Sequence, residues 1–270
     1  MSRKQWTGWS TPRAGDEQAE QHYLIEPRYL AGGGDLRHVT EYLRACGWRD
    51  KSKTGGPVVF DSPDKSVRIG YDPFTQPGGW TIRGKRTARQ EAWHATFGRQ
   101  TPVEIVAGLT DALTTARTAH APNVWEPLLD QGWKTEQGRH FTARSPDGDA
   151  FVRFHQSGPG QAHWWAGARN EHGRMWEATF TPTTPMHLVQ AVSTALADPQ
   201  PVMRPLGHIP PSRRIRTTSV SVLPSRLAAW QQARITAARA ATWARHSFAA
   251  NRSRTPPGAR PYAGQSGRAR

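Results

Sequence analysis

What the sequence lacks narrows the class of protein before any motif is considered. There is one cysteine, Cys46, so the chain can form no internal disulfide and no cysteine-rich zinc site. No run of 18 apolar residues occurs, and the first residues lack the apolar segment of a signal peptide. We therefore expect a cytoplasmic protein with no membrane partner.

Acidic residues and lysine are both absent from the last quarter of the chain. Residues 204–270 contain 13 arginines and hold most of the formal net charge of +15. A basic segment of this kind attracts polyanions, because each positive charge near a phosphate releases a condensed counterion. A GC-rich genome would explain arginine in place of lysine, but it would not explain the missing acids.

The chain contains an internal repeat with an offset of 83–85 residues. The matches are Gly-Trp at 47–48 and 132–133, Ser-Pro-Asp at 62–64 and 145–147, Val-Arg at 67–68 and 152–153, and Trp-x-Ala-Thr-Phe at 93–97 and 176–180. Tryptophans match as 48/133, 80/165 and 93/176, which predicts core positions. The offsets change in steps of two, which keeps strand faces inward but would rotate a helix by about 200°. The middle of each repeat is therefore predicted to be strand.

The ends of each repeat have the pattern of helices. Asp35, Asn123 and Thr101 stand where N-caps are expected, and Glu104 follows Thr101 at the spacing of a capping box. The predicted fold class is α+β, with two tandem repeats of helix, four-stranded antiparallel sheet and helix, followed by a basic helical and disordered tail. The predicted segments are a flexible 1–25, repeats at 26–117 and 118–204, a linker at 205–222, an Ala/Arg-rich helix at 223–250 and a disordered 251–270.

These residues resemble a known family. "EPRYLAGGGDLRHVTEYLRACGW", "SPD", "WHATFGRQTPVEIVAGLTDAL" and "WEATFTPTTPMHLVQAVSTALADPQPV" are similar to the duplicated actinobacterial domain named for its SPDY-type motif. The resemblance covers about residues 26–204 and implies the duplicated architecture. The family is one of unknown function, so it implies no catalytic residues. Lys65 and Gly148 stand in place of the motif's tyrosine.

The repeated Ser-Pro-Asp is the first candidate for chemistry. Its serines could act as nucleophiles, and the neighbouring Asp61, Asp64, Asp147 and Asp149 could act as acids or metal ligands. The alternative is a type I turn, with serine, proline and aspartate each at its preferred place, and this interpretation is favoured. Of the scattered histidines, only His155 and His163 could face each other across a hairpin. We therefore predict no metal site, no cofactor and no catalytic residue.

Alternation along the strands predicts a basic outer face on the first repeat. If Ile69, Trp80, Ile82 and Phe97 point inward, their neighbours point outward. The candidate contacts on this face and its loop are Arg68, Arg83, Lys85, Arg86, Arg89 and His94. Trp164, which has no match in the first repeat, is predicted to be exposed for stacking or partner contact. An ordinary solvated face is the alternative interpretation.

The C-terminal part supplies further candidate contacts. They are Arg213, Arg214, Arg216, Arg226, Arg234, Arg239, Arg245, Arg252 and Arg254. Arginines on all sides of the predicted helix favour phosphates or an acidic partner over a membrane surface. The leading hypothesis is a non-enzymatic, largely sequence-independent nucleic-acid-binding protein, with DNA favoured over RNA. The alternative is a protein-interaction module, including binding to an acidic protein, with a solubilising or recruiting tail.

Overall fold

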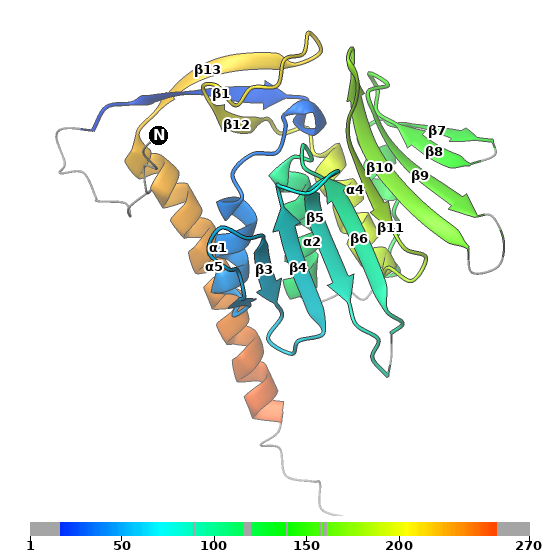
Figure 1. Cartoon of the computed structure of the whole chain (residues 1–270), viewed down its shortest axis with the longest axis vertical. Coiled ribbons are helices and arrows are strands. Elements are labelled where there is room, and N and C mark those ends of the chain that lie inside the picture. Colours follow the sequence, from blue (N-terminus) through cyan, green and yellow to red (C-terminus); the bar gives the residue numbers. More distant parts are fainter. Residues whose placement is uncertain are drawn as a thin grey trace, which may run out of the picture.

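The computed structural model describes residues 17–88, 90–115, 120–138, 140–156, 158 and 161–252, with the backbone alone at 244–252. Within these residues the protein is a mixed α+β structure with two antiparallel sheets and five α-helices. Figure 1 shows the larger sheet with helices behind it, the smaller sheet at one end, and the long C-terminal helix alongside.

The larger sheet has ten strands, of which each repeat supplies five. Its order is β2-β3-β4-β5-β6-β11-β10-β9-β8-β7. The bounds are β2 Arg49–Asp50, β3 Val58–Asp61, β4 Val67–Asp72, β5 Gly79–Gly84, β6 Trp93–Gly98, β7 Lys134–Gln137, β8 Phe141–Arg144, β9 Ala150–Gln156, β10 Ala162–Asn170 and β11 Gly173–Phe180. The prediction of four strands per repeat is thus one strand short, because β2 and β7 are short and exposed and have no apolar alternation.

The two repeats meet at the pairing of β6 with β11. Thr96 lies opposite Thr179, its own counterpart in the second repeat, and Phe97 lies opposite Ala178 while Ala95 lies opposite Phe180. Equivalent residues of the two repeats thus pair with each other in reverse order, so the two repeats are related by a local twofold axis near the Thr96–Thr179 pair. The Phe97 and Phe180 rings pack edge to face beside it, 5.6 Å apart. The duplication therefore produces one continuous sheet.

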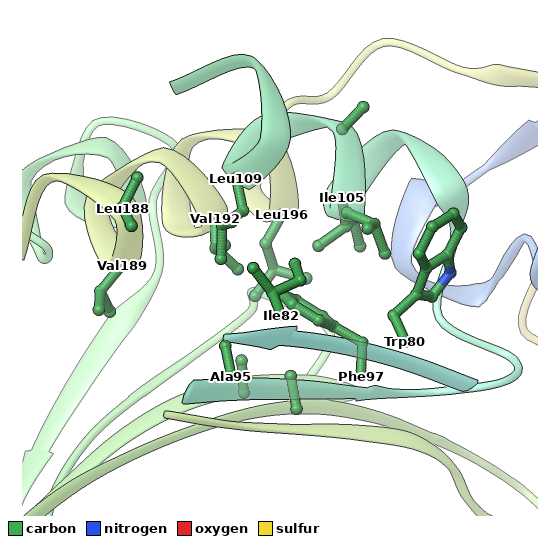
Figure 2. Packing of buried hydrophobic residues seen from close by; sticks show 14 of the residues in the cluster. Trp80, Ile82, Ala95, Phe97, Ile105, Leu109, Leu188, Val189, Val192 and Leu196 are labelled. Carbon is green, nitrogen blue, oxygen red and sulfur yellow. The ribbon is translucent and has the colours of Figure 1, made fainter. Parts of the chain in front are cut away.

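Four helices cover one face of this sheet: α1 Arg37–Ala45, α2 Val103–Thr114, α3 Glu126–Leu129 and α4 Met186–Ala197. Figure 2 shows Ile105 and Leu109 of α2, and Val192 and Leu196 of α4, packed towards Ile82 and the neighbouring inward side chains of β5 and β6. Burial of these side chains stabilises the fold by about 1.5–3 kcal/mol each. The predicted inward faces are confirmed, since Ile69, Trp80, Ile82 and Phe97 are all buried.

Two of the three predicted helix caps accept a backbone hydrogen bond. Asp35 accepts from the Arg37 amide at 2.9 Å, and Asn123 accepts from the Trp125 amide at 3.1 Å. The prediction for Thr101 is wrong, because its buried hydroxyl has no hydrogen-bond partner among the described residues. The Val103 amide donates instead to the Gly33 carbonyl, which supplies the missing acceptor.

Two segments predicted to be irregular contain strands. Glu20–Glu26, within the expected flexible start, forms β1, and Arg216–Val222, within the expected linker, forms β13. Together with β12, Val202–Pro205, they make a sheet of order β12-β1-β13. The residues that pair between these strands are about 180–200 positions apart in the sequence. The local sequence pattern therefore gives little indication that these segments form strands.

The Ala/Arg-rich helix is present as α5, Pro224–Arg252, and it lies along α1 (Figure 1). Its contact face is centred on Ala238, which is 4% exposed, and not on Trp230, which is 55% exposed. Residues 253–270, most of the predicted disordered tail, lie outside the described part.

The strand pairing corrects the alignment of the two repeats. Tyr71 pairs with Trp80 in the first repeat, and Phe154 pairs with Trp164 in the second. Phe60 pairs with Ile69, and its counterpart Ala143 pairs with Val152, so the Val-Arg match is wrong by two residues and Phe154 corresponds to Tyr71. The counterpart of Trp80 is therefore Trp164, not Trp165, and the β9–β10 hairpin is one residue longer than the β4–β5 hairpin. A change of one residue in hairpin length is tolerated because the extra residue lies in the turn, outside the paired strands. There it moves no strand residue to the other face of the sheet.

Candidate functional site

The second face of the ten-stranded sheet has no helix on it within the described chain (Figure 1). On this open face, three basic side chains of the first repeat lie in one row across neighbouring strands. Arg68 of β4 is directly opposite Arg83 of β5, and Arg83 is directly opposite His94 of β6. All three are exposed, as their strand positions predicted.

One carboxylate lies at the end of this basic row. Arg68 donates two hydrogen bonds to Asp61, at 2.7 and 3.0 Å. These bonds, with the fields of Lys85 and Lys51, hold the pKa of Asp61 below its ordinary value. A single acid thus stands among Arg68, Arg83, Lys85 and Lys51. Lys51 was not among the predicted contacts, because it precedes β3 in a loop without a strand pattern.

The row continues into the second repeat. The Thr181 amide donates to the His94 carbonyl at 3.0 Å, and Phe180 next to it pairs with Trp164 of β10. One residue further along β10, His163 lies opposite His155, as the sequence predicted. The Nδ1 atoms of His155 and His140 are 2.6 Å apart, which extends the row to the start of β8. His140 was missed, although extending the hairpin register by one strand would have found it.

Trp165 lies beside this row on the open face. It is half-buried, and the ring centroids of His163 and His155 are 5.6 and 6.2 Å from its own. Thr179 and Arg153 are its neighbours across the strands. The prediction that Trp164 is exposed was wrong: it is 6% exposed and packs against Trp125 and Phe154 in the core. The alternation was correct, but the misplaced alignment exchanged the two tryptophans.

A pocket of about 570 Å³ lies on the same face where the repeats meet. Its floor consists of small side chains, including Gly79, Thr81, Thr96, Gly98 and Thr179. Arg99, Arg174 and Glu177 also line it, and Arg174 pairs with Glu177 at 3.2 Å. The open face is thus basic in the first repeat, hollow at the seam and aromatic in the second repeat.

Ion pairs occupy several of the C-terminal arginines. Arg214 pairs with Asp149, Arg216 with Glu26 at 2.9 Å, and Arg234 with Asp111 at 2.8 Å. Arg204, counted with the basic segment by composition, is buried against Glu104. Composition gives no sign of these ion pairs, because the acids come from distant parts of the chain.

The other predicted contacts fall into three groups. Arg86 pairs with Glu91 at 2.7 Å. Arg213, Arg226 and Arg239 are exposed, and none has an ion pair within the described residues. Arg89 and Arg254 lie outside the described residues, as do the side chains of Arg245 and Arg252.

Arg234 has a structural role in the packing of α5. Its guanidinium lies 4.4 Å from the centroid of the Tyr42 ring on α1, as well as pairing with Asp111 on α2. Burial raises the pKa of Tyr42 to about 12, and the Tyr42 hydroxyl lies 2.9 Å from that of Thr114. These contacts hold Arg234 against α1 and α2.

The repeated Ser-Pro-Asp is a turn in both copies. The Lys65 amide donates to the Ser62 carbonyl, and the Gly148 amide to the Ser145 carbonyl, both at 2.9 Å. Ser145 is buried; its hydroxyl donates to Asp147 at 2.6 Å and accepts from the Ala150 amide at 2.8 Å. The motif's hydrogen bonds are therefore used to close the hairpin.

The second turn also contacts the N-terminal part of the chain. The Tyr29 hydroxyl donates to Asp147 at 2.6 Å, and burial together with this carboxylate raises the pKa of Tyr29 well above its ordinary value. Tyr29 and Asp147 line a pocket of about 410 Å³ beside Arg28, Arg214 and Arg216. Its arginines pair with neighbouring carboxylates, so it presents little net charge.

Two kinds of feature are absent from the described residues. No three histidine, cysteine, aspartate or glutamate side chains there gather closely enough to hold a metal ion. No described helix combines the length and apolar character needed to cross a membrane.

Comparison with known proteins identifies the repeats. No curated protein and no solved structure matches the chain. The family model SPDY, a domain of unknown function (DUF317), matches it twice, over residues 61–119 and 144–202. Both ends of the second match are 83 residues beyond those of the first, the same offset as Thr96 and Thr179 at the seam. Each repeat of the chain thus contains a region that matches this domain of unknown function.

Proposed function

We propose that this protein is a non-enzymatic nucleic-acid-binding protein that contacts phosphates through the basic row of the open face. The observation that carries the proposal is the adjacency of Arg68, Arg83 and His94 on consecutive strands. Arg68 and Arg83 bring two positive charges together, and Asp61 balances only one of them. A phosphate above Arg83 would balance the other and release counterions.

The balance of charge on this face also supports the proposal. Of its acids, Asp61 and Glu177 already pair with Arg68 and Arg174, and Asp72 accepts hydrogen bonds from the Phe74 and Thr75 amides. Arg83 and Lys85 remain exposed, and neither has an ion pair within the described residues. Contacts of this kind read the backbone and not the bases, so binding would be largely sequence-independent, with DNA favoured over RNA.

The C-terminal part would add contacts through Arg213, Arg226 and Arg239. Deleting residues 205–270 is a poor test of that role, because it removes β13 from the smaller sheet and α5 from its place on α1. Single charge substitutions leave these elements in place and are the better probe.

The test is the salt dependence of binding to labelled DNA and RNA, measured by fluorescence anisotropy. Arg83→Gln is expected to weaken binding to all sequences alike and to lower the slope of log K against log salt by about one. The matched control is Arg216→Gln, which makes the same charge change in the smaller sheet, where Arg216 pairs with Glu26. Equal affinities and slopes for the two variants would refute the proposal.

The alternative function is a protein-interaction module. Trp230 and Trp243 of α5 are 55% and 74% exposed, and exposed tryptophans are frequent anchors of protein interfaces. After nuclease treatment, a stoichiometric partner that binds wild-type protein but not the Trp230→Ala, Trp243→Ala variant would favour this function. Retention of that partner by the variant would exclude these two side chains as its anchor.

A further inference from the structure

The two repeats carry different side chains at equivalent positions of the open face. By the corrected alignment, Thr81 of the first repeat corresponds to Trp165 of the second, and Gly79 corresponds to His163. The exchange of counterparts at the seam brings these different surfaces into one sheet. The molecule thus presents a basic half and an aromatic half side by side.

The aromatic half, which contains Trp165 and His163 of β10, lies on the same face as the basic row. One line of strand partners runs from Thr81 through Thr96 and Thr179 to Trp165, and ends beside Arg153. At a strand spacing of about 4.8 Å, Trp165 on β10 is about 14 Å from the line of β5, which carries Arg83. The floor between them is the seam pocket, where threonine and glycine leave room above the sheet.

We infer that the open face binds single-stranded nucleic acid, with bases stacked on Trp165 while the phosphates follow the basic row. The inference rests on the proposed function and specifies its ligand. Aromatic rings beside a basic groove are the means by which sequence-tolerant proteins hold single strands, usually over about 4–16 nucleotides per domain. The separation of Arg83 and Trp165 falls within the reach of such a segment.

The ring position favours a single strand over a duplex. Stacking requires a base with a free face, whereas each base pair inside a duplex is covered on both faces by its neighbours. Trp165 lies on the sheet with His163 two positions before it on β10 and Arg153 opposite it on β9, so only a base turned towards the sheet can reach it. The basic row alone would bind single strands and duplexes alike. A preference for single strands therefore tests this inference separately from the proposed function.

The experiment compares three labelled ligands: an oligothymidylate of about 15 nucleotides, an abasic strand of the same length, and a duplex. Trp165→Ala is expected to weaken oligothymidylate binding about 5- to 150-fold, because it removes base stacking. Trp165→Phe keeps an aromatic ring and is expected to retain most of the affinity. Binding of the abasic strand and the duplex, which offer phosphates alone, is expected to be unchanged by either substitution.

The controls distinguish stacking from a loss of fold. Trp230→Ala removes an exposed tryptophan from α5 and is expected to leave all three affinities unchanged. If Trp165→Ala binds oligothymidylate as tightly as the wild type, or weakens all three ligands equally, the inference is overturned. In those cases a loss of binding in Arg83→Gln would still uphold the proposed function. If the wild type binds none of the ligands, both fail.

Discussion

Glu104 and Arg204 form a buried ion pair between the first helix–sheet repeat and the smaller sheet. Arg204 is 3% exposed, and its guanidinium donates two hydrogen bonds to Glu104, at 2.7 and 2.8 Å. It also donates to the Ala31 and Gly32 carbonyls, each at 3.1 Å. Replacing Glu104 leaves a buried guanidinium without its counter-charge. The sequence pattern alone places Glu104 in a capping box, which predicts a much smaller loss of stability on replacement.

The expected loss of stability follows from this burial. Removing one partner of a buried ion pair costs about 3–5 kcal/mol, because the remaining charge is left uncompensated. For a protein of this size, each kcal/mol lowers the melting temperature by about 2–4 °C, so Glu104→Ala should lower it by about 6–20 °C. Glu104→Gln keeps one hydrogen bond and should lie at the lower end.

The assay is urea denaturation at pH 7, followed by tryptophan fluorescence and circular dichroism. The control is Glu91→Gln, which breaks the exposed Glu91–Arg86 pair and should cost less than about 1 kcal/mol. Burial alone would raise the pKa of Glu104, but Arg204 outweighs it and holds that pKa below its ordinary value. The contribution should therefore be complete at pH 7 and lost as the pH falls through the folded-state pKa. A cost for Glu104→Gln no larger than that for Glu91→Gln would refute the reasoning.

Two further predictions concern His38 and the Ser-Pro-Asp turns. Burial, followed by the charge of Arg234, lowers the pKa of His38 to about 4. The unfolded chain then takes up a proton first, so stability should fall by up to about 3 kcal/mol between pH 6.5 and 4, and His38→Gln should flatten that part of the urea-denaturation profile. Ser145→Ala leaves the Ala150 amide without its acceptor, so it should cost about 1–3 kcal/mol in the same assay. It should leave nucleic-acid affinity unchanged, and a selective loss of binding without a loss of stability would contradict the turn assignment.

Local alternation predicted one side of the candidate site well. Arg68, Arg83 and His94 face outward, because inward neighbours such as Ile69 and Ile82 must be buried and successive strand residues point to opposite faces. The same rule required Trp164 and Trp165 to point in opposite directions, but it could not say which one faces the core. That choice depended on the alignment of the repeats, which the short Val-Arg match shifted by two residues in β9 and by one residue at the tryptophan in β10.

The charge of the C-terminal segment shows a different limit. Composition correctly found arginines without acids in residues 204–270. It could not show that Arg214, Arg216 and Arg234 pair with Asp149, Glu26 and Asp111, because these partners lie 65, 190 and 123 positions away. The net charge of residues 204–270 therefore overestimates how many arginines of this segment lack an ion pair.

The sequence by itself determined the duplication, the strand character of each repeat and the faces of the strands in the first repeat, because these depend on period and alternation along the chain. Only the tertiary structure decided that β6 pairs with β11, which joins the basic row of one repeat to the aromatic group of the other. It also decided that β1 and β13 are strands and that α5 packs on α1. Hydrogen bonds between strands and ion pairs join residues far apart in the chain, so no local pattern specifies them.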